Sequence, residues 1–533
     1  MDSISLKYGF ILIIISSFLS CKNFSDLNKE TNMKEKNDDE FMYRPNIHFA
    51  PQKNWMNDPN GMFYHKGKYH LYFQHNPNSN VWGPMHWGHA TSENLIHWNE
   101  HPIALYPDKL GTIFSGSAVV DLENTSGFGS IENPPIVAIF TNHNSEEEKK
   151  GSELFQNQSI AYSLDDGYSW EKYNGNPVIK NPGIKDFRDP KVIWYEKDKK
   201  WILTLAASQV TKFYESKDLK KWNFISSFGE GIGNHNGVWE CPDLFELQVK
   251  GTSKTKWVHL VSINPGGPNG GSATQYFVGD FDGKKFTIDE KFENQMKKNH
   301  DFWTDFGRDN YAGVTYFNGT NNKFRKLYQG WMSNWQYAGL VPTKTWRSAM
   351  TLPRELELHY SQQGGYRLRS KIISQLEKNI TKTLEIEDQL LKEKTIIAND
   401  AMIDLSSTKI QMKLSDMEKT MYSFVLSNSQ GDSLKFGYDH ELKKFFIDRS
   451  KSGIVNFSKN FVPNSSYANR LDTTNDLNVV IILDKTSIEL FYDNGDIVMT
   501  EIFFPKAPYE KLSLYYRGTK TSLKELKIQE IKK

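Results

Sequence analysis

The sequence predicts an all-β protein in which a five-bladed β-propeller is followed by a β-sandwich. Three observations favour this fold. Aromatic residues make up 14% of the chain, a share that suits strands. A turn followed by an aromatic residue recurs about every 60 residues, which indicates a propeller rather than a solenoid. Five times, a polar residue opens an apolar strand and a second apolar strand follows it.

The first 20 residues resemble a signal peptide. Lys7 precedes an apolar segment over residues 10–19, which is too short to span a bilayer, and Ser20 precedes Cys21. A small residue before Cys resembles a bacterial lipoprotein processing site. We therefore expect an exported protein that a lipid on Cys21 anchors at the cell envelope, in the periplasm or at the cell surface. Secretion with cleavage nearby is the alternative. Residues 21–42 are polar and charged, and are expected to form a flexible tether.

The turn motif occurs three times, with a weaker fourth copy. The copies are Ser92–Trp98, Ser163–Trp170, Ser216–Trp222 and Gly279–Phe286. In each copy, the final aromatic residue is expected to begin a strand.

The strand openings interleave with these turns over residues 43–360, the predicted propeller. They are Asp58, 114–117, 188–190, 240–242 and 305–307. The second strands are 69–74, 136–141, 201–206, 257–262 and 327–331. In a propeller the first strand of each blade lines the central channel, so the openings should converge at one end of it.

The pattern changes after the predicted propeller. Residues 361–407 are charged and mixed, and are interpreted as a linker and the start of the next domain. Residues 408–533 alternate between apolar and polar positions in short strands, with polar turns such as 493–495 between them. This spacing predicts a β-sandwich.

Composition narrows the classes of partner. The formal net charge is +1 and no basic cluster stands out, which argues against nucleic acid as a partner. Cys21 and Cys241 are the only cysteines, so no disulfide framework is expected, and Cys241 is interpreted as a buried free thiol. Several histidines between residues 65 and 101 lack the spacing of a zinc motif, so neither a metal nor a cofactor is expected. They are His70, His75, His86, His89, His97 and His101.

The predicted pocket brings together Asp58, Asp189, Glu240 and Asp305, and this carboxylate set suits glycoside cleavage. That reaction commonly needs one carboxylate that attacks the anomeric carbon and one carboxyl that protonates the leaving oxygen. Crowded carboxylates raise the pKa of one member, because like charges disfavour joint ionisation. Asp305 is either structural or part of a subsite, and the structural role is favoured.

Neighbouring residues suggest a role for each acid. Glu240 follows Trp239 and precedes Cys241, so it is partly desolvated and suits the proton donor. Asp58 lies among amide side chains that would hold it ionised, which suits a nucleophile. Asp189 beside Arg188 is expected to stay charged and to stabilise a developing oxocarbenium ion.

Several segments, in their order along the chain, resemble the motif set of glycoside hydrolase family 32, the β-fructosidases. They are Trp55–Gly61, Phe114–Ser117, Arg188–Pro190 and Glu240–Pro242. Residues 264–271, 305–309 and 333–337 are similar to the branch that acts on fructan polymers, and residues 488–505 to the C-terminal sandwich of the family. The resemblance runs from about Arg44 to the C-terminus.

The resemblance implies a five-bladed propeller with a sandwich, and a retaining mechanism. Asp58 would be the nucleophile, Glu240 the acid/base and Asp189 the transition-state stabiliser. The family releases terminal β-D-fructose from levan, inulin or sucrose, so a fructan polysaccharide or sucrose is the implied partner. The residues implied at the fructose subsite are Trp55, Met56, Asn57, Gln74, Trp82, Phe114, Ser115, Arg188 and Trp335.

Several alternatives stay open at this point. Within the family, an endo-levanase or a fructosyltransferase competes with an exo-acting hydrolase, and the sequence does not separate β-2,6 from β-2,1 linkages. Outside it, the rivals are a non-catalytic fructan-binding propeller and an inverting arabinanase. The retention of three acids argues against the first rival, and the segment Trp55–Gly61 against the second.

Overall fold

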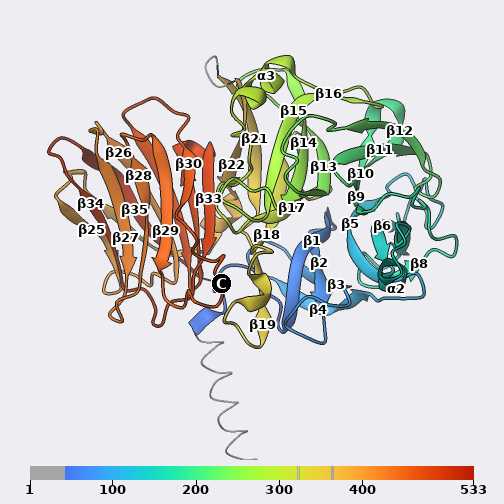
Figure 1. Ribbon diagram of the computed structural model, residues 1–533, viewed down its shortest axis with the longest axis horizontal. Helices are drawn as coiled ribbons and strands as arrows, with labels where there is room; N and C mark the ends of the chain where they lie inside the picture. The colour runs from blue at the N-terminus through green and yellow to red at the C-terminus, as the bar shows by residue number, and fades with distance from the viewer. Residues whose placement is uncertain (1–41, 321, 323, 362–364, 533) are drawn as a thin grey trace, which may run out of the picture.

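The computed structural model describes residues 42–320, 322, 324–361 and 365–532. These residues form two β-domains that lie side by side: an N-terminal propeller around a central channel and a C-terminal two-sheet sandwich (Figure 1). The all-β prediction and the order of the domains are therefore confirmed. The predicted signal peptide, Cys21 and the tether up to residue 41 lie outside the described residues.

The first four sheets of the propeller each contain four consecutive antiparallel strands. The first two hold β1 (Asn54–His65), β2 (Lys68–Asn76), β3 (His86–Ser92), β4 (Asn99–Leu105), and β5 (Thr112–Val120), β6 (Ile136–His143), β7 (Gln156–Ser163), β8 (Glu171–Lys172). The next two hold β9 (Phe187–Tyr195), β10 (Lys200–Ala207), β11 (Val210–Ser216), β12 (Asn223–Phe228), and β13 (Val238–Gln248), β14 (Thr255–Asn264), β15 (Ala273–Phe281), β16 (Phe286–Ile288).

A fifth sheet completes the series. It contains β17 (Tyr311–Thr315), β18 (Lys326–Met332), β20 (Ala349–Met350), β21 (Arg354–Ser361) and β22 (Gly365–Ile372). Nearby, β19 (Trp346–Arg347) pairs in parallel with β1, which joins the end of the propeller to its beginning. Because β22 pairs with β21 along its whole length, the predicted boundary at residue 360 divides a hairpin, and residues 365–372 are not a linker.

The predicted turn motif lies between the third and fourth strands of the first four sheets. Two copies share the same hydrogen bonds: the indole of Trp98 donates to the Leu95 carbonyl at 3.1 Å, and that of Trp222 to the Leu219 carbonyl at 3.0 Å. Leu95 and Leu219 both have positive φ, 68° and 60°. These two copies therefore form the same tight turn, which the hydrogen bond from the indole stabilises.

The sandwich consists of two sheets. One contains β23 (Ile380–Ile386), β24 (Gln389–Leu390), β26 (Ser407–Ser415), β31 (Leu477–Asp484), β32 (Ser487–Tyr492), β33 (Ile497–Ile502) and β35 (Ser522–Ile531). The other contains β25 (Lys394–Asn399), β27 (Met421–Ser427), β28 (Ser433–Asp439), β29 (Lys444–Lys451), β30 (Ser466–Asn469) and β34 (Lys511–Tyr516).

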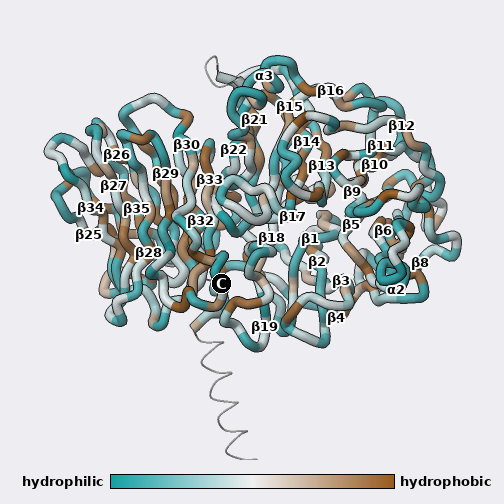
Figure 2. The backbone as a smooth tube through the Cα atoms, in the orientation of Figure 1, coloured by the Kyte–Doolittle hydropathy of each residue, from teal (hydrophilic) through white to brown (hydrophobic). Residues whose placement is uncertain are grey.

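Helices are short and peripheral. They are α2 (Ser145–Lys149), α3 (Glu290–Lys298) and the 3-10 turns η1 (Glu196–Asp198), η2 (Ala338–Leu340), η3 (Ser374–Asn379) and η4 (Asp493–Gly495). Hydrophobic residues run along the strands, while the loops at the outer edges are hydrophilic (Figure 2). Among the helices of the described residues, none has the length and apolar character needed to cross a bilayer.

The two domains meet through a buried network of charges. Arg354 of β21 donates from Nη1 to Asp305 Oδ2 at 2.8 Å and from Nη2 to Glu489 Oε2 of β32 at 2.6 Å. Asp305 also accepts hydrogen bonds from the backbone and the hydroxyl of Thr500 of β33, at 2.9 Å and 2.6 Å. The expectation that Asp305 lies in the pocket is therefore wrong, whereas its favoured structural role agrees with these contacts.

Gly307 lies at this contact between the domains, where there is no room for a side chain. A Cβ atom at this position would lie 2.0 Å from the carbonyl oxygen of Thr500. The loop before β17 therefore touches the backbone of the sandwich directly.

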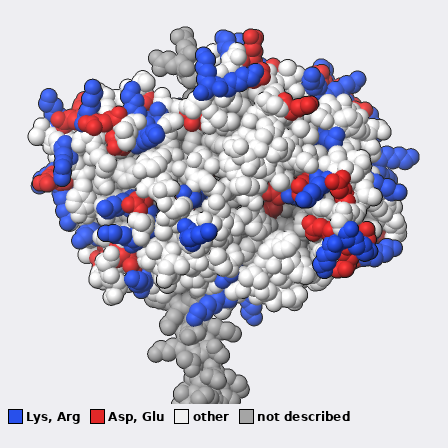
Figure 3. Space-filling view, viewed as in Figure 1, with Lys and Arg blue, Asp and Glu red and all other residues white. Residues whose placement is uncertain are grey.

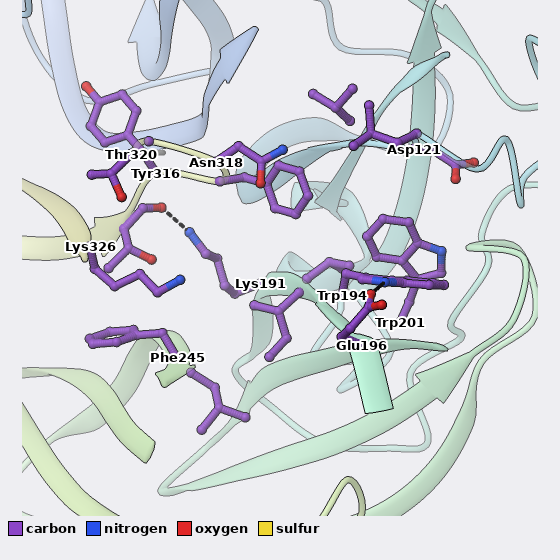
Figure 4. Close-up of a pocket in the computed structure, with 18 of the residues that line it drawn as sticks. Asp121, Lys191, Trp194, Glu196, Trp201, Phe245, Tyr316, Asn318, Thr320 and Lys326 are labelled. Atoms are coloured by element: carbon purple, nitrogen blue, oxygen red, sulfur yellow. Dashed lines mark hydrogen bonds between the residues drawn. The ribbon is translucent and has the colours of Figure 1, made fainter. Parts of the chain in front are cut away.

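The end of the channel opposite the predicted openings holds a separate cavity of about 450 Å³ (Figure 4). The far ends of β5, β9 and β17 line it, with Val120, Trp194 and Thr315 among the residues. Lys191 reaches into it and donates from Nζ to the Thr315 carbonyl, while Asp243 Oδ2 accepts from the Thr315 backbone at 2.6 Å. These groups are buried between the two ends of the channel.

Candidate active site

The first strands are irregular where the predicted opening residues enter the channel. The register shifts lie between Met56 and Pro59 in β1, Ile113 and Gly116 in β5, Arg188 and Lys191 in β9, Glu240 and Asp243 in β13, and Tyr311 and Val314 in β17. A β-bulge twists a strand locally and redirects one side chain. The bulges therefore turn the opening residues out of the sheet ladder and toward the channel.

The local sequence favours these bulges. Pro59 directly follows Asp58, and Pro190 directly follows Asp189. A proline cannot donate a hydrogen bond to the neighbouring strand, so it is tolerated at a bulge. Asp189 has φ of 66° and Cys241 has φ of 45°, a conformation that non-glycine residues seldom adopt. Strained backbone of this kind concentrates at functional sites.

Asp58 is held on both carboxylate oxygens. Ser115 donates its hydroxyl to Asp58 Oδ2 at 2.7 Å, and Asn57 donates from Nδ2 to Asp58 Oδ1 at 3.1 Å. The Trp55 indole in turn donates to Asn57 Oδ1 at 2.7 Å. Asn60 fixes the backbone, because its amide donates to the Asp58 carbonyl at 2.8 Å. The segment from Trp55 to Asn60 is therefore a preorganised support for one carboxylate.

Asp189 lies close to Asp58, on the other side of Cys241. The Cys241 backbone donates to Asp189 Oδ2 at 3.1 Å, and the Asp189 backbone donates to the Thr141 hydroxyl at 3.0 Å. The Cys241 thiol lies 3.7 Å from Asp58 Oδ2 and 3.6 Å from Asp189 Oδ2. Cys241 is buried and free, as expected, and it separates two carboxylates that face each other.

Glu240 is held by a cation and a phenol. Arg188 donates from Nε at 3.1 Å and from Nη2 at 3.0 Å to Glu240 Oε1, and the Tyr311 hydroxyl donates to Glu240 Oε2. Arg188 also donates to Asp186 Oδ1 at 2.6 Å. Arg188 is the neighbour of Asp189 in the sequence, whereas in the structure its guanidinium is bonded to Glu240 and Asp186.

Burial changes the protonation of the two aspartates. Burial and the nearby charge of Glu240 raise the pKa of Asp58 to about 6, against the opposing effect of the hydrogen bonds from Ser115 and Asn57. Burial also raises the pKa of Asp189; Arg188 opposes this shift, while Glu240 and Asp58 add to it. The pKa of Asp189 is therefore raised, although Arg188, its neighbour in the sequence, favours the charged form.

Aromatic side chains surround this cluster. The Trp55 ring lies 5.8 Å from that of Trp335, and both contact Trp331. Trp82 is 48% exposed and meets Phe114 edge to face at 6.1 Å, which places it at the rim.

Two further residues named from the sequence are structural neighbours of the site. Gln74 donates from Nε2 to the Ile113 carbonyl at 3.0 Å, and Met56 is fully buried. The structure therefore brings the sequence-predicted residues to one end of the channel, with Asp305 as the exception.

Sequence reasoning missed Tyr311, the residue of the fifth sheet that reaches the site. The sequence pattern places the fifth opening at Asp305, which precedes β17, whereas Tyr311 is the first residue of that strand. The start of the apolar run at Tyr311 was the available signal. Thr141 contacts Asp189 and Gln156 contacts Arg188, and neither residue lies in a distinguishing motif.

Within the described part of the chain, no three His, Cys, Asp or Glu side chains are placed to hold a metal ion.

Two family models match the chain. The model described as Glycosyl hydrolases family 32 N-terminal domain covers residues 48–370, and Glycosyl hydrolases family 32 C terminal covers residues 366–530. Together they span both domains of the structure.

Individual relatives agree with these matches. A levanase from Bacillus subtilis (strain 168) is 44% identical over 498 residues, which cover 92% of this chain and 71% of the relative. An extracellular exo-inulinase from Aspergillus niger is 39% identical over 495 residues, covering 87% and 90%. A solved fructofuranosidase from Schwanniomyces occidentalis, complexed with fructosylnystose, has a TM-score of 0.81 at 34% identity and covers 93% of this chain and 99% of its own. The chain therefore belongs to glycosyl hydrolase family 32.

Proposed function

We propose that this glycosidase releases terminal β-D-fructose from fructans, and more slowly from sucrose, with retention of configuration. The observation that carries the proposal is the convergence of Asp58, Asp189 and Glu240, through three bulged strands, at one end of the channel. The relatives named levanase and exo-inulinase, which are similar over most of the chain, support the substrate class.

In the first step, the Asp58 carboxylate bonds to carbon 2 of the terminal fructosyl unit while the bond to the leaving oxygen breaks. Glu240 gives its proton to that oxygen. In the second step, Glu240 removes a proton from water, water attacks carbon 2, and the bond to Asp58 breaks. The raised pKa of Asp58, about 6, makes it a stronger nucleophile that is still ionised at neutral pH.

Asp189 and Arg188 would assist both steps through their charges and hydrogen bonds. Asp189 lies against Asp58 across the Cys241 thiol, where a carboxylate can stabilise positive charge on the sugar ring or bond its hydroxyls. Arg188 and Tyr311 fix the orientation of Glu240.

The fructose subsite is proposed to use the residues named from the sequence. Trp82, Phe114 and Trp335 would form apolar walls, as is usual for a pocket with few polar anchors. Ser115 and Asn57 orient Asp58, and Trp55 orients Asn57. Met56 and Gln74 would support the wall from behind, because both are buried.

Exo attack is supported by the relative named extracellular exo-inulinase, which is similar over 87% of this chain. Deeper in the channel, Lys191, Asp243 and Thr315 are buried and bonded to one another. The alternatives within the family are endo cleavage of levan and transfer of the fructosyl unit to an acceptor sugar. Both need the remainder of the substrate, or an acceptor, above the same acids.

We further propose that each of the five successive sheets is one propeller blade. On this basis the propeller extends from about residue 43 to Ile372, and the sandwich begins near Ile380.

Export of the protein is supported by the relative described as extracellular. A lipid on Cys21 remains our proposal from the sequence, and Cys21→Ser should move the activity from the membrane fraction to the soluble fraction. Unchanged fractionation would favour plain secretion.

The test is product analysis on levan, inulin and sucrose side by side. Fructose as the sole early product, first seen by NMR as the β anomer, supports the proposal. A ladder of oligosaccharides before any fructose indicates an endo enzyme, and new fructosylated products indicate transfer. Binding of fructan without any release of reducing sugar would indicate a non-catalytic propeller.

A further inference from the structure

His143 is a buried histidine behind one wall of the candidate site. It is the last residue of β6 and is 5% exposed. Its ring stacks on that of Phe114, with the centroids 4.2 Å apart and an angle of 3° between the planes. Phe155 meets the His143 ring edge to face at 5.3 Å. The His143 ring therefore fixes the orientation of Phe114, which is proposed as an apolar wall of the fructose subsite.

Hydrogen bonds assign the proton of neutral His143 to Nε2. Gln156, the first residue of β7, lies directly opposite His143 in the ladder. Gln156 Oε1 accepts from the Phe187 backbone at 2.8 Å and from Arg188 Nη1 at 3.4 Å. Gln156 Nε2 therefore faces His143 Nδ1, at 3.3 Å, and since an amide nitrogen only donates, Nδ1 is the acceptor. His143 Nε2 then donates to Glu148 Oε2 at 3.1 Å.

These contacts join the surface of the protein to the candidate acid/base. The side chain of Glu148 is 49% exposed, and His143 lies between it and Gln156. Gln156 contacts Arg188, whose guanidinium donates to Glu240 Oε1 at 3.1 Å and 3.0 Å. His143 is therefore the link between an exposed carboxylate and the guanidinium that orients the proposed proton donor.

The segment 144–155, which connects β6 to β7 and contains α2, brings Glu148 to the histidine. The Asn144 backbone donates to the Phe155 carbonyl at 2.8 Å and closes the segment at its base. Figure 3 shows charged side chains gathered over α2, toward the lower right of that face. Two acids of α2 pair with lysines of the same segment, whereas Glu148 contacts His143. The two pairs are Glu146–Lys149 at 2.9 Å and Glu147–Lys150 at 2.8 Å.

The neutral form of His143 is the one that fits these partners. Burial lowers its pKa, Glu148 opposes this shift, and Arg188 adds to it. These two charged groups face the ring from α2 and from β9, and the aromatic and amide side chains that also contact it are uncharged. A proton on Nδ1 would turn a second donor toward the Gln156 amide and break that contact.

We propose that His143 is a positioning residue for fructoside hydrolysis. Its ring keeps Phe114 in place to bind the fructosyl unit, and its Nδ1, through Gln156, keeps Arg188 in place to orient Glu240. This inference rests on the proposed function. The two contributions act on different kinetic quantities: loss of the ring weakens sugar binding and raises KM, whereas loss of the polar contact misaligns the proton donor and lowers kcat.

Two variants separate the ring from its polar edge. His143→Phe keeps a ring against Phe114 but has no acceptor for Gln156, so kcat on levan or sucrose should fall about fivefold while KM changes less than twofold. His143→Gln keeps an acceptor but has no ring, so KM should rise about threefold while kcat changes less than twofold. On an activated fructoside, the first step of His143→Phe should run at close to the wild-type rate, because a good leaving group needs less protonation.

Glu148→Ala and Glu147→Ala form a matched pair in α2. The two carboxylates are similarly exposed, 49% and 43%, but Glu148 contacts His143 and Glu147 contacts Lys150. We expect Glu148→Ala to lower kcat about twofold and Glu147→Ala to leave it unchanged. If the His143 variants do not fold, this pair decides the matter, and an equal kcat for its two members would overturn the inference.

The outcomes separate the inference from the function on which it rests. If the wild type releases no fructose from any substrate, the proposed function fails and the inference falls with it. If the wild type is active but both His143 variants, at wild-type melting temperatures, keep its kcat and KM, the inference alone fails. The same change of kcat and KM in both variants, with lowered melting temperatures, would show a purely structural role and also overturn it.

Discussion

Two buried carboxylates of this protein, Asp58 at the channel and Glu489 at the seam between the domains, have pKa values that their surroundings shift in opposite directions. At the channel, burial raises the pKa of Asp58 to about 6. At the seam between the domains, burial alone would raise the pKa of Glu489, but Arg354 and then His48 lower it to about 2. Two equally buried carboxylates therefore have pKa values that are shifted in opposite directions.

The two sites differ in the cationic side chains that are bonded to each carboxylate. At the seam, Glu489 has Arg354 on Oε2 and His48 on Oε1, at 2.6 Å and 2.9 Å, so its charge is fully paired. At the channel, Arg188 is the nearby guanidinium, and Glu240 and Asp186 take its hydrogen bonds. Removing the cation from a buried ion pair is costly, so the acids at the seam depend on Arg354, whereas acids with raised pKa values are typical of functional sites.

The largest expected effect separates activity from stability at the channel. Asp58→Asn should lower kcat by on the order of 10⁴-fold or more, since it removes the proposed nucleophile. The melting temperature at pH 7 should stay equal or increase, because the variant no longer buries a charge. Kinetics and thermal unfolding on one preparation provide the check. A variant that loses activity because it unfolds would contradict this account of the channel.

Glu240→Gln should lower kcat on natural fructans by about 10²–10⁴-fold, the usual contribution of a general acid. Substrates with good leaving groups need less protonation, so the first step on them should recover most of its rate. Burst kinetics with an activated fructoside and with sucrose compare the two. Equal losses on both substrates would contradict the acid role.

Arg354→Met tests the seam. Removing Arg354 leaves Asp305 without its cation and Glu489 with His48 alone, and should destabilise the fold by about 3–5 kcal/mol. The fraction that is folded at low temperature should keep a near-normal kcat on sucrose, because Arg354 is bonded to Asp305 and Glu489 rather than to the channel acids. Denaturant unfolding measures the loss, with Arg325→Met as the exposed control, for which about 0–1 kcal/mol is expected.

The smallest expected effect is a pH dependence of opposite sign in the two regions. The folded pKa of Asp58 exceeds its ordinary value of 3.8, so its buried charge costs up to about 3 kcal/mol at neutral pH, and that cost decreases as pH falls below about 6 and is gone near the ordinary value. The folded pKa of Glu489 is below its ordinary value of 4.5, so its stabilisation is complete above about pH 4.5 and is lost as pH falls toward 2.

Unfolding free energies of wild type, Asp58→Asn and Glu489→Gln between pH 3 and pH 8 check both signs. The advantage of Asp58→Asn over wild type should be present at pH 8 and vanish by pH 4. The deficit of Glu489→Gln should be present at pH 8 and shrink below pH 4.5. A pH-independent difference for Asp58→Asn would show that its charge is not buried at a cost.

Local sequence determined the strands and three of the acids at the site. Alternation and turn residues predict strands because the side chains of a strand point to alternate faces. The acids Asp58 and Asp189, each followed by proline in a strand-like run, mark the places where a ladder must be interrupted. Both observations depend on a few neighbouring residues, and the structure agrees with them.

Partners distant in the chain were decided by the tertiary structure. Arg188 is next to Asp189 in sequence but bonds Glu240, which is 52 residues away, because adjacent first strands meet at the channel. Asp305 bonds Thr500, 195 residues away, so it belongs to the seam. Tyr311 reaches Glu240 because the strand begins there and not at Asp305. Local patterns specify where the backbone bends; the closure of the sheets around the channel specifies which side chains then meet.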